Sequence, residues 1–377
     1  MNQFPFTKSE VITNLINFSQ HELHNYTSNR NFDYGAPHHN VSKISPYLRR
    51  RFISENEVLG VVLKDHKFNN IEKFIEEIFW RTYWKGWLES HPWIYDEYNA
   101  YDEDQSIPKK TGIKCFDHWK EELLDTGYLH NHSRMWFASI WIFTLGYSWQ
   151  SGANFFKNNL LDYCPASNTL GWRWVAGLQT IGKPYIAQAD NIKFFTNARF
   201  YPRNQLKENY ILNDKNITNG KPINFNRYEE NIFNKNENLG VIINNNDLSL
   251  HQLLNEKELV YDCCLFSTNN KNILIDNFEK KIFEDIRKED QSIIPVYNFQ
   301  DIYKWLKEKN IKNLILPHET VGNKIFNKNE FLKKITNLDV NFTFYLREWD
   351  ANAFPHATKG FFNFKKQIYN LLNRTNI

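Results

Sequence analysis

The most informative stretch of the chain runs from residue 111 to residue 185 and reads TGIKCFDHWKEELLDTGYLHNHSRMWFASIWIFTLGYSWQSGANFFKNNLLDYCPASNTLGWRWVAGLQTIGKPY. Apolar residues recur in it at spacings of three and four, which predicts packed helices. The apolar positions are interrupted by polar and aromatic side chains that are candidates for a functional site: Arg134, Trp149, Asp162, Asn168, Trp172 and Trp174. Arg134 and Asp162 carry opposite charges and are candidates for a buried ion pair. Each residue taken alone is also compatible with ordinary core packing.

The same helical spacing extends over the first half of the chain, for example in residues 10–23, 71–90 and 116–129. We therefore predict a helical domain over residues 1–201. Residues 202–238 contain eleven Asn and few periodic apolar positions, which predicts a linker or loop.

After residue 239 the pattern changes to short β-rich runs that alternate with helical stretches. The β-rich runs are LGVIIN (239–244), ELVYDCCLFS (258–267), SIIPVYN (292–298), NLILPHE (313–319) and VNFTFYLREW (340–349). Alternation of this kind predicts a small α/β domain over residues 239–377 with a mostly parallel sheet. The predicted fold class is thus α+β overall, with an all-α domain first. Neither a GxGxxG nor a P-loop motif is present, so the second domain has no cofactor signature of its own.

Composition narrows the class of protein without naming a function. The 377 residues carry a net charge of only +3, so attraction to nucleic acid would need a local basic face. Four cysteines occur without a CxxC pair, which argues against a disulfide framework and against a zinc or iron-sulfur site: Cys115, Cys164, Cys263 and Cys264. No metal site is expected. The sequence has no signal-peptide pattern and no apolar run of 18 residues, and we expect a cytoplasmic location.

The order and spacing of residues 111–185 resemble the FAD-binding domain of the DNA photolyase and cryptochrome family. The matching elements are a TG turn, Asp117, the block HN-x-x-RM, W-x-x-G, D-x-x-x-A-x-N-x-x-x-W-x-W-x-x-G and a final PY. Two earlier blocks extend the resemblance to about residues 20–200: VSKISPYLRRRFIS (41–54) and EEIFWRTYW (76–84). The family normally places its α/β domain before the helical one. A circular permutation or an unrelated appended domain would both explain the reversed order, and permutation is slightly favoured.

The resemblance implies non-covalent FAD, and it assigns ten positions to the cofactor. They are Tyr26, Ser42, Lys43, Ile44, Ser45, Arg81, Arg134, Asp162, Cys164 and Asn168. Ser42 to Ser45 would hold the diphosphate, because hydroxyls and backbone N–H groups at a helix start suit an anion. Arg134 and Asp162 would form a salt bridge against the isoalloxazine, and Asn168 would face flavin N5, where an amide can tune the redox potential.

The resemblance also implies a partner, DNA that carries a cyclobutane pyrimidine dimer. Five residues match the positions that hold the flipped-out lesion: Glu77, Trp80, Asn131, Met135 and Trp174. Trp172 and Trp149 match the first two members of an electron relay to the flavin, and the third is uncertain, with Trp93, Tyr95 and Tyr98 nearby. The implied function is repair of the dimer, driven by near-ultraviolet or blue light through reduced FAD.

Departures from the family pattern keep other functions open. Cys164 replaces an Asp that meets flavin N3, His132 replaces an Arg that grips DNA phosphate, and Arg173 replaces a Gln. A cryptochrome-like photoreceptor without repair activity is the alternative, and a relative that has lost flavin is a third. Basic residues near the predicted flavin pocket are candidates for phosphate contacts, although such a run is usually a solvated surface: Arg49, Arg50, Arg51, Lys85, His130, His132 and Arg134.

Overall fold

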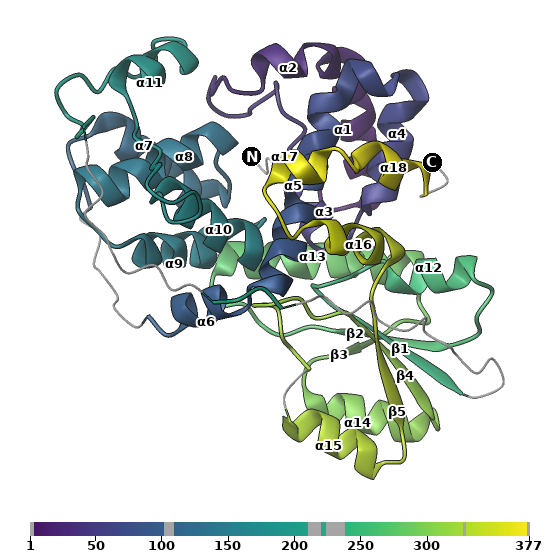
Figure 1. The fold of residues 1–377 in the computed structure, drawn as a ribbon. Coiled ribbons are helices and arrows are strands. Elements are labelled where there is room, and N and C mark those ends of the chain that lie inside the picture. The colour runs from purple at the N-terminus through teal and green to yellow at the C-terminus, as the bar shows by residue number, and fades with distance from the viewer. Residues whose placement is uncertain (1–3, 102–108, 210–219, 224–237, 327–328, 375–377) are drawn as a thin grey trace.

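The computed structural model describes residues 4–101, 109–209, 220–223, 238–326 and 329–374. The first half is helical, as predicted (Figure 1). Its α-helices are α1 (Lys8–His21), α2 (Tyr26–Asn29), α3 (Ser45–Arg49), α4 (Glu55–Asp65), α5 (Phe68–Ser90), α6 (Trp93–Asn99), α7 (Lys114–Thr126), α8 (Asn131–Ser139), α9 (Trp149–Asn159), α10 (Pro165–Val175) and α11 (Ala189–Phe195).

Local sequence signals explain where several of these helices begin and end. A capping box starts α4, because the Ser54 side chain accepts from the backbone N–H of Glu57 while the Glu57 carboxylate accepts from the backbone N–H of Ser54. Gly127 ends α7 with a left-handed backbone at φ 69°, which costs glycine little. The long helix α5 buries Phe74 and Phe79 and forms the central support of this half.

The second half contains a five-stranded sheet in the order β3-β2-β1-β4-β5, and every pairing is parallel. The elements are β1 (Leu239–Ile243), α12 (Leu250–Glu256), β2 (Asp262–Phe266), α13 (Ile273–Glu289), β3 (Ile294–Val296), α14 (Phe299–Glu308), β4 (Asn313–Pro317), α15 (Asn329–Asn337) and β5 (Asn341–Tyr345). The central strand β1 is buried along its whole length, while β5 is partly exposed at an edge. The predicted α+β class with a parallel sheet is therefore confirmed.

The two faces of the sheet bury different cores. Ile242 and Leu314 pack with Trp305 of α14 and Phe331 of α15. On the other face, Val241 belongs to an apolar cluster that continues through α13 into α1, α4 and α5. The helical half and the sheet therefore share one core on that side.

The chain returns to the helical half after the sheet. The helices α16 (Glu348–Ala353), α17 (Phe361–Lys365) and α18 (Ile368–Asn373), with a 3-10 turn at Phe354–His356, lie along α5 and α4 in Figure 1. Trp349 stacks on Phe79 of α5 at 4.6 Å and donates from Nε1 to Thr82. The division into domains at residues 202–238 stays a prediction, and the final helices contact the first half.

The described parts of the predicted linker, residues 202–209, 220–223 and 238, contain no helix or strand, and residues 210–219 and 224–237 lie outside the described residues. Within the described ranges, every helix is too short or too polar to span a membrane.

Candidate functional site

Arg134 and Asp162 form the predicted ion pair between α8 and the loop before α10. The guanidinium donates two hydrogen bonds to the carboxylate, at 3.0 and 2.8 Å. Ser45 donates a third, from Oγ to Asp162 Oδ2 at 2.6 Å. Burial alone would lower the pKa of Arg134, but Asp162 outweighs it and the pKa is raised. Three segments distant in sequence are thus fixed together by one carboxylate.

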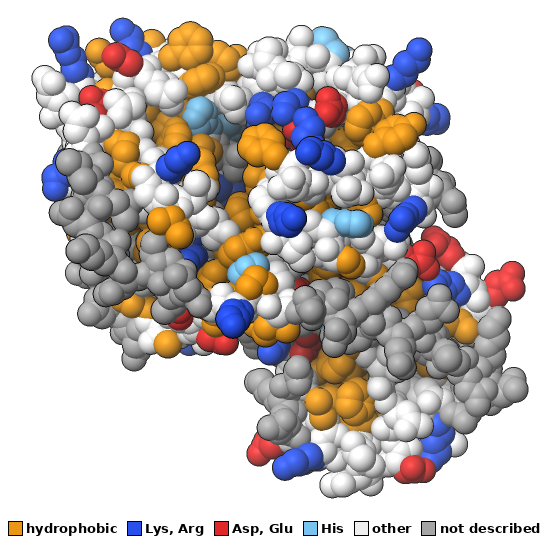
Figure 2. All heavy atoms as spheres, in the orientation of Figure 1, with side chains coloured by type: hydrophobic (Ala, Val, Ile, Leu, Met, Phe, Trp, Pro, Cys, Tyr) orange, Lys and Arg blue, Asp and Glu red, His pale blue; other side chains and the backbone are white. Residues whose placement is uncertain are grey.

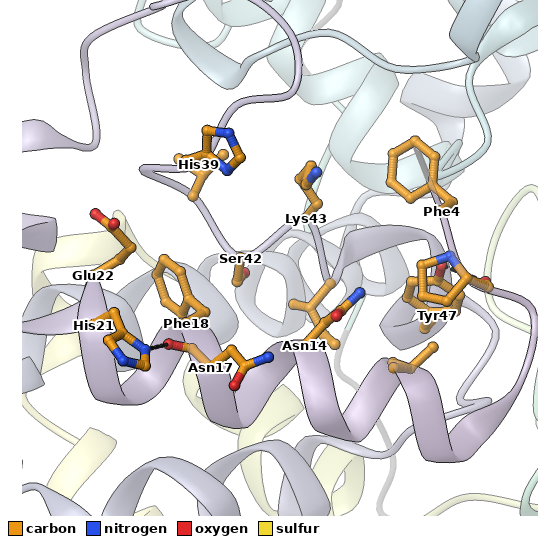
Figure 3. Close-up of a pocket in the computed structure, with 14 residues that line it drawn as sticks. Phe4, Asn14, Asn17, Phe18, His21, Glu22, His39, Ser42, Lys43 and Tyr47 are labelled. Atoms are coloured by element: carbon orange, nitrogen blue, oxygen red, sulfur yellow. Dashed lines mark hydrogen bonds between the residues drawn. The ribbon is translucent and has the colours of Figure 1, made fainter. Parts of the chain in front are cut away.

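A cavity of about 330 Å³ opens between α1 and the loop before α3 (Figure 3). Ser42, Lys43 and Ile44 line one wall, and Asn14 and Asn17 of α1 line the opposite wall. Burial lowers the pKa of Lys43, and its ammonium bonds to no residue in the described ranges. A cationic amine and a hydroxyl in a cavity suit an anionic group. The helix that follows, α3, has only five residues, so its contribution to anion binding is small.

Tyr26 and Glu77 lie near each other in the helical half. The Tyr26 ring meets Phe74 edge-on at 5.4 Å, and the Glu77 carboxylate accepts from Arg30 at 2.8 Å. Burial raises the pKa of Glu77, and Arg30 lowers it by less, so the net direction is upward. Tyr128 contributes to the raised pKa of Tyr26. The guanidinium of Arg134 lies 5.3 Å from the Tyr128 ring centre. Tyr128 therefore stands between Tyr26 and the ion pair of Arg134 with Asp162.

Trp80 follows Glu77 by one helical turn on α5 and is partly buried. Its ring stacks on Phe361 of α17, with ring centres 3.6 Å apart and planes 11° apart. One face of the indole is therefore covered by the chain itself.

The other predicted lesion residues come from the opposite group of helices. Asn131 and Met135 lie on α8, and Trp174 lies on α10, where it stacks on Tyr185 at 5.4 Å. Asn131 is exposed, and the other two are partly exposed. Figure 2 shows a hollow between this group of helices and the group that contains α1, α2 and α17. The structure places Glu77 and Trp80 on one group and Asn131, Met135 and Trp174 on the other.

Arg81 and Cys164 lie at the junction with the sheet rather than at the larger cavity. Both line a cavity of about 20 Å³ at the carboxyl ends of β1 and β4. Arg81 donates to Glu55 at 3.2 Å and to the carbonyl of Arg49 at 3.1 Å. Burial would raise the pKa of the Cys164 thiol, but Arg81 and neighbouring cations outweigh it, so the pKa is lowered.

Asn168 and Trp172 are buried on α10, next to α9. The Asn168 amide donates one hydrogen bond from Nδ2 to the carbonyl of Ala153 at 2.9 Å, which fixes the orientation of the side chain. Trp172 packs directly over Gly152, since a Cβ built there would lie 2.2 Å from the indole ring.

Trp149 begins α9, and Tyr98 of α6 stacks on it at 5.7 Å with 27° between the planes. The sequence named Tyr98 as one of three aromatic residues near the uncertain third relay position, and its ring lies against Trp149. The guanidinium of Arg173 also lies over the Trp149 ring, 5.8 Å from the ring centre.

The interpretation of Arg49, Arg50 and Arg51 as phosphate contacts is wrong for the folded protein. Arg50 pairs with Glu279 at 2.7 Å, and Arg51 pairs with Asp350 at 2.6 Å. Arg49 donates to the carbonyls of Tyr163 and Asn245.

The other predicted phosphate contacts are also occupied. Lys85 pairs with Asp350 at 2.7 Å, and Arg134 is committed to Asp162. His130 is buried with a lowered pKa of about 3, and His132 stacks on Trp136 at 4.0 Å. Arg50, Arg51 and Lys85 are paired with carboxylates of the second half of the chain, whereas His130, His132 and Arg134 have their partners within the helical half.

Comparison with known proteins identifies the central part of the helical half. A family model described as the FAD binding domain of DNA photolyase matches residues 64–213. This segment is therefore similar to the FAD-binding domain of DNA photolyases.

The curated relatives carry the same family name. Deoxyribodipyrimidine photo-lyases from Alkalihalophilus pseudofirmus and from the Buchnera aphidicola of Acyrthosiphon pisum are 29% and 28% identical over 191 and 203 residues. These matches cover 47% and 49% of this chain but only 39% and 41% of the relatives, so the chain spans less than half of their length. A bacterial class III photolyase from Agrobacterium tumefaciens is 26% identical, with a TM-score of 0.43, over 53% of this chain and 44% of that one.

The FAD-binding domain implies FAD as the cofactor, and the residues present fit it in part. Ser42 and Lys43 offer a hydroxyl and an unpaired ammonium to a diphosphate. Arg134 and Asp162 form the salt bridge that the resemblance assigns to the isoalloxazine. Arg81 is turned toward Glu55, although its buried Nε has no partner among the described residues and remains a possible donor.

Two residues that contact the predicted lesion residues Glu77 and Trp80 were not predicted from the sequence. Arg30 lies 47 positions before Glu77, and Phe361 lies 281 positions after Trp80. Neither stands in a motif, and no periodicity connects such distant positions. The only available signal was the aromatic and basic composition around residue 361.

Proposed function

We propose that the protein uses light to repair cyclobutane pyrimidine dimers in DNA by electron transfer from reduced FAD. The photolyase-type FAD-binding domain and the names of the curated relatives support this class of reaction. The observation that carries the proposal is the raised pKa of Glu77 on the same helix face as Trp80. Burial of this carboxyl favours its protonated form, and a protonated carboxyl can donate to a pyrimidine carbonyl as negative charge develops there.

FAD, when bound and reduced, would supply the electron that light drives onto the dimer. The chain's own residues would hold the reactants. Arg134 and Asp162 fix α8 to the loop before α10, so that Asn131 and Met135 are presented at a defined position beside the hollow. The bond from Asn168 Nδ2 to Ala153 holds the amide in place, and its oxygen would accept a hydrogen bond from a protonated flavin N5.

The aromatic residues would have two separate tasks. Trp80 and Trp174 would stack on the flipped-out bases from opposite sides of the hollow, because every base offers a π-face to an indole. Trp172 and Trp149 would carry electrons inward to the flavin. Tyr98 is the nearest aromatic ring to continue that path, since it stacks on Trp149.

One observation favours the alternative, a cryptochrome-like photoreceptor without repair activity. In the free protein Glu77 is already paired with Arg30, and one face of Trp80 is already stacked on Phe361. A repair enzyme must loosen the first contact and use the free face of the second residue when a lesion enters. A photoreceptor would need neither change.

The test compares Trp80→Ala and Glu77→Gln with the wild type in light-dependent repair of a defined dimer. Trp80→Ala should weaken lesion binding by about 1–3 kcal/mol, because it removes the indole ring on which one base of the lesion would stack. Glu77→Gln should keep binding but lower repair per absorbed photon, since it removes the proton that balances the developing charge. Flavin content, measured by absorption, should be unchanged in both.

Wild-type protein that contains photoreducible FAD but repairs no dimer in single-stranded or duplex DNA would rule out the repair proposal. The photoreceptor would then be the better description. Because Trp80 also packs on α17, the unfolding midpoint of Trp80→Ala serves as the folding control.

A further inference from the structure

The end of the chain has an unusual charge distribution. Residues 351–374 contain no Asp or Glu, and they contain four basic residues: Lys359, Lys365, Lys366 and Arg374. The whole chain has a net charge of only +3, so this segment concentrates more positive charge than the molecule carries overall. We call residues 354–374 the C-terminal basic segment.

Packing fixes this segment beside a residue of the proposed lesion site. Phe361 is buried and stacks on Trp80, and Phe364 packs against Tyr83 at 5.4 Å. Lys365 pairs with Glu72 and Glu76 of α5, which ties α17 down further. In Figure 1, α17 lies next to the space between the two groups of helices, and Figure 2 shows Lys and Arg side chains along that rim of the hollow.

Other side chains of the same segment face solvent. Phe362 is 83% exposed and Tyr369 is 61% exposed, which is rare for large aromatic residues. Lys359 and Lys366 are exposed and form no ion pair with a described residue. Proteins that bind single-stranded nucleic acid combine the same two features. Their exposed aromatic rings stack on the bases, and their positively charged groups bind the phosphates.

We propose that the C-terminal basic segment binds the DNA strand next to Trp80, with Lys359 and Lys366 on phosphates and Phe362 on a base. The arginines that the sequence suggested for this task are buried in ion pairs, whereas these lysines are free. DNA is the occupant that the charge favours, because the segment has no acidic residue of its own. The inference rests on the proposed function only for the position of the lesion.

The experiment measures dark binding of full-length protein to undamaged single-stranded DNA at several salt concentrations. The double variant Lys359→Gln/Lys366→Gln should bind more weakly, and the slope of log K against log salt should shrink by about 1.4, since each phosphate contact on a single strand contributes about 0.7. Phe362→Ala should weaken binding roughly five- to a hundredfold, as expected for loss of one stacked base.

Matched controls are Lys333→Gln on α15 and Tyr297→Ala before α14, both exposed on the sheet half. Equal effects of the segment variants and these controls on affinity and slope would overturn the proposal. Tight salt-sensitive binding to phosphatidylserine vesicles, with no effect of the segment variants on DNA, would also overturn it. Because the assay uses undamaged DNA in the dark, failure of repair activity leaves this result interpretable.

Discussion

At the scale of single residues, the Asp162 carboxylate shows how one buried charge organises a site. It accepts two hydrogen bonds from Arg134 and one from Ser45, and its side chain is only 5% exposed. Without it, a largely buried guanidinium would lose its only carboxylate partner in the described ranges. Loss of this carboxylate would therefore destabilise α8, the helix that carries Arg134, Asn131 and Met135.

We predict that Asp162→Ala loses FAD during purification. Removal of one partner from a buried ion pair costs about 3–5 kcal/mol, because the other charge stays desolvated. Flavin absorbance per protein after gel filtration measures the loss. Glu308→Ala, which breaks an exposed pair with Lys304, is the control and should retain flavin. Full flavin occupancy in Asp162→Ala would show that this pair does not support the cofactor.

At the scale of elements, the contact between α9 and α10 depends on a missing side chain. Gly152 lets the Trp172 ring lie against the α9 backbone, and any Cβ at that position would overlap the ring. The two helices carry Trp149 and Trp172, so this contact helps to fix the spacing of the segments on which those two rings stand. Glycine inside a helix is otherwise unfavourable, which makes this position informative.

We predict opposite outcomes for the same substitution at two glycines. Gly152→Ala should destabilise the protein by about 1–3 kcal/mol, because it overpacks the contact with Trp172. Gly171→Ala on α10 should stabilise it by about 0.5–1 kcal/mol, because no heavy atom lies within 4 Å of the added Cβ and alanine favours the helix. Urea unfolding followed by tryptophan fluorescence measures both. Equal changes in the free energy of unfolding for the two variants would contradict the close contact between Gly152 and Trp172.

At the scale of the whole molecule, Asp350 joins the last helices to the first half. Its carboxylate pairs with Arg51 at 2.6 Å and Lys85 at 2.7 Å, and all three side chains are buried. Burial would raise the pKa of Asp350, but the two cations outweigh it and the pKa is lowered. The stability from this carboxylate is therefore present above its unfolded pKa of about 4 and is lost as the pH falls below that value.

We predict that Asp350→Ala lowers the free energy of unfolding at pH 7 by about 3–5 kcal/mol, since it leaves two buried cations unpaired. The difference from wild type should shrink as the pH falls below about 4. Glu348→Ala on the same helix breaks an exposed pair with Lys257 and should change stability by less than about 1 kcal/mol. A pH-independent difference for Asp350→Ala would contradict the linkage.

The sequence by itself determined the fold class and the core of the FAD-binding domain. Local patterns suffice for the fold class, because helix and strand periodicity is visible in neighbouring residues, whereas the FAD-binding domain was predicted from the resemblance of its motifs to a known family. The ion pair of Arg134 with Asp162 was also predictable, since both residues stand in one motif-rich segment of 75 residues. The assignment of individual residues to FAD or to a lesion remains a prediction from resemblance.

Only the tertiary structure decided which charges are available at the surface. The run Arg49 to Arg51 looks like a basic face in the sequence, yet Glu279 and Asp350, more than 200 residues away, bury Arg50 and Arg51 in ion pairs. The free lysines at the chain end, and the stacking of Phe361 on Trp80, depend on the same return of the chain to α5. Such contacts join distant residues whose pairing no local period records, so the free energy of packing the whole chain selects them.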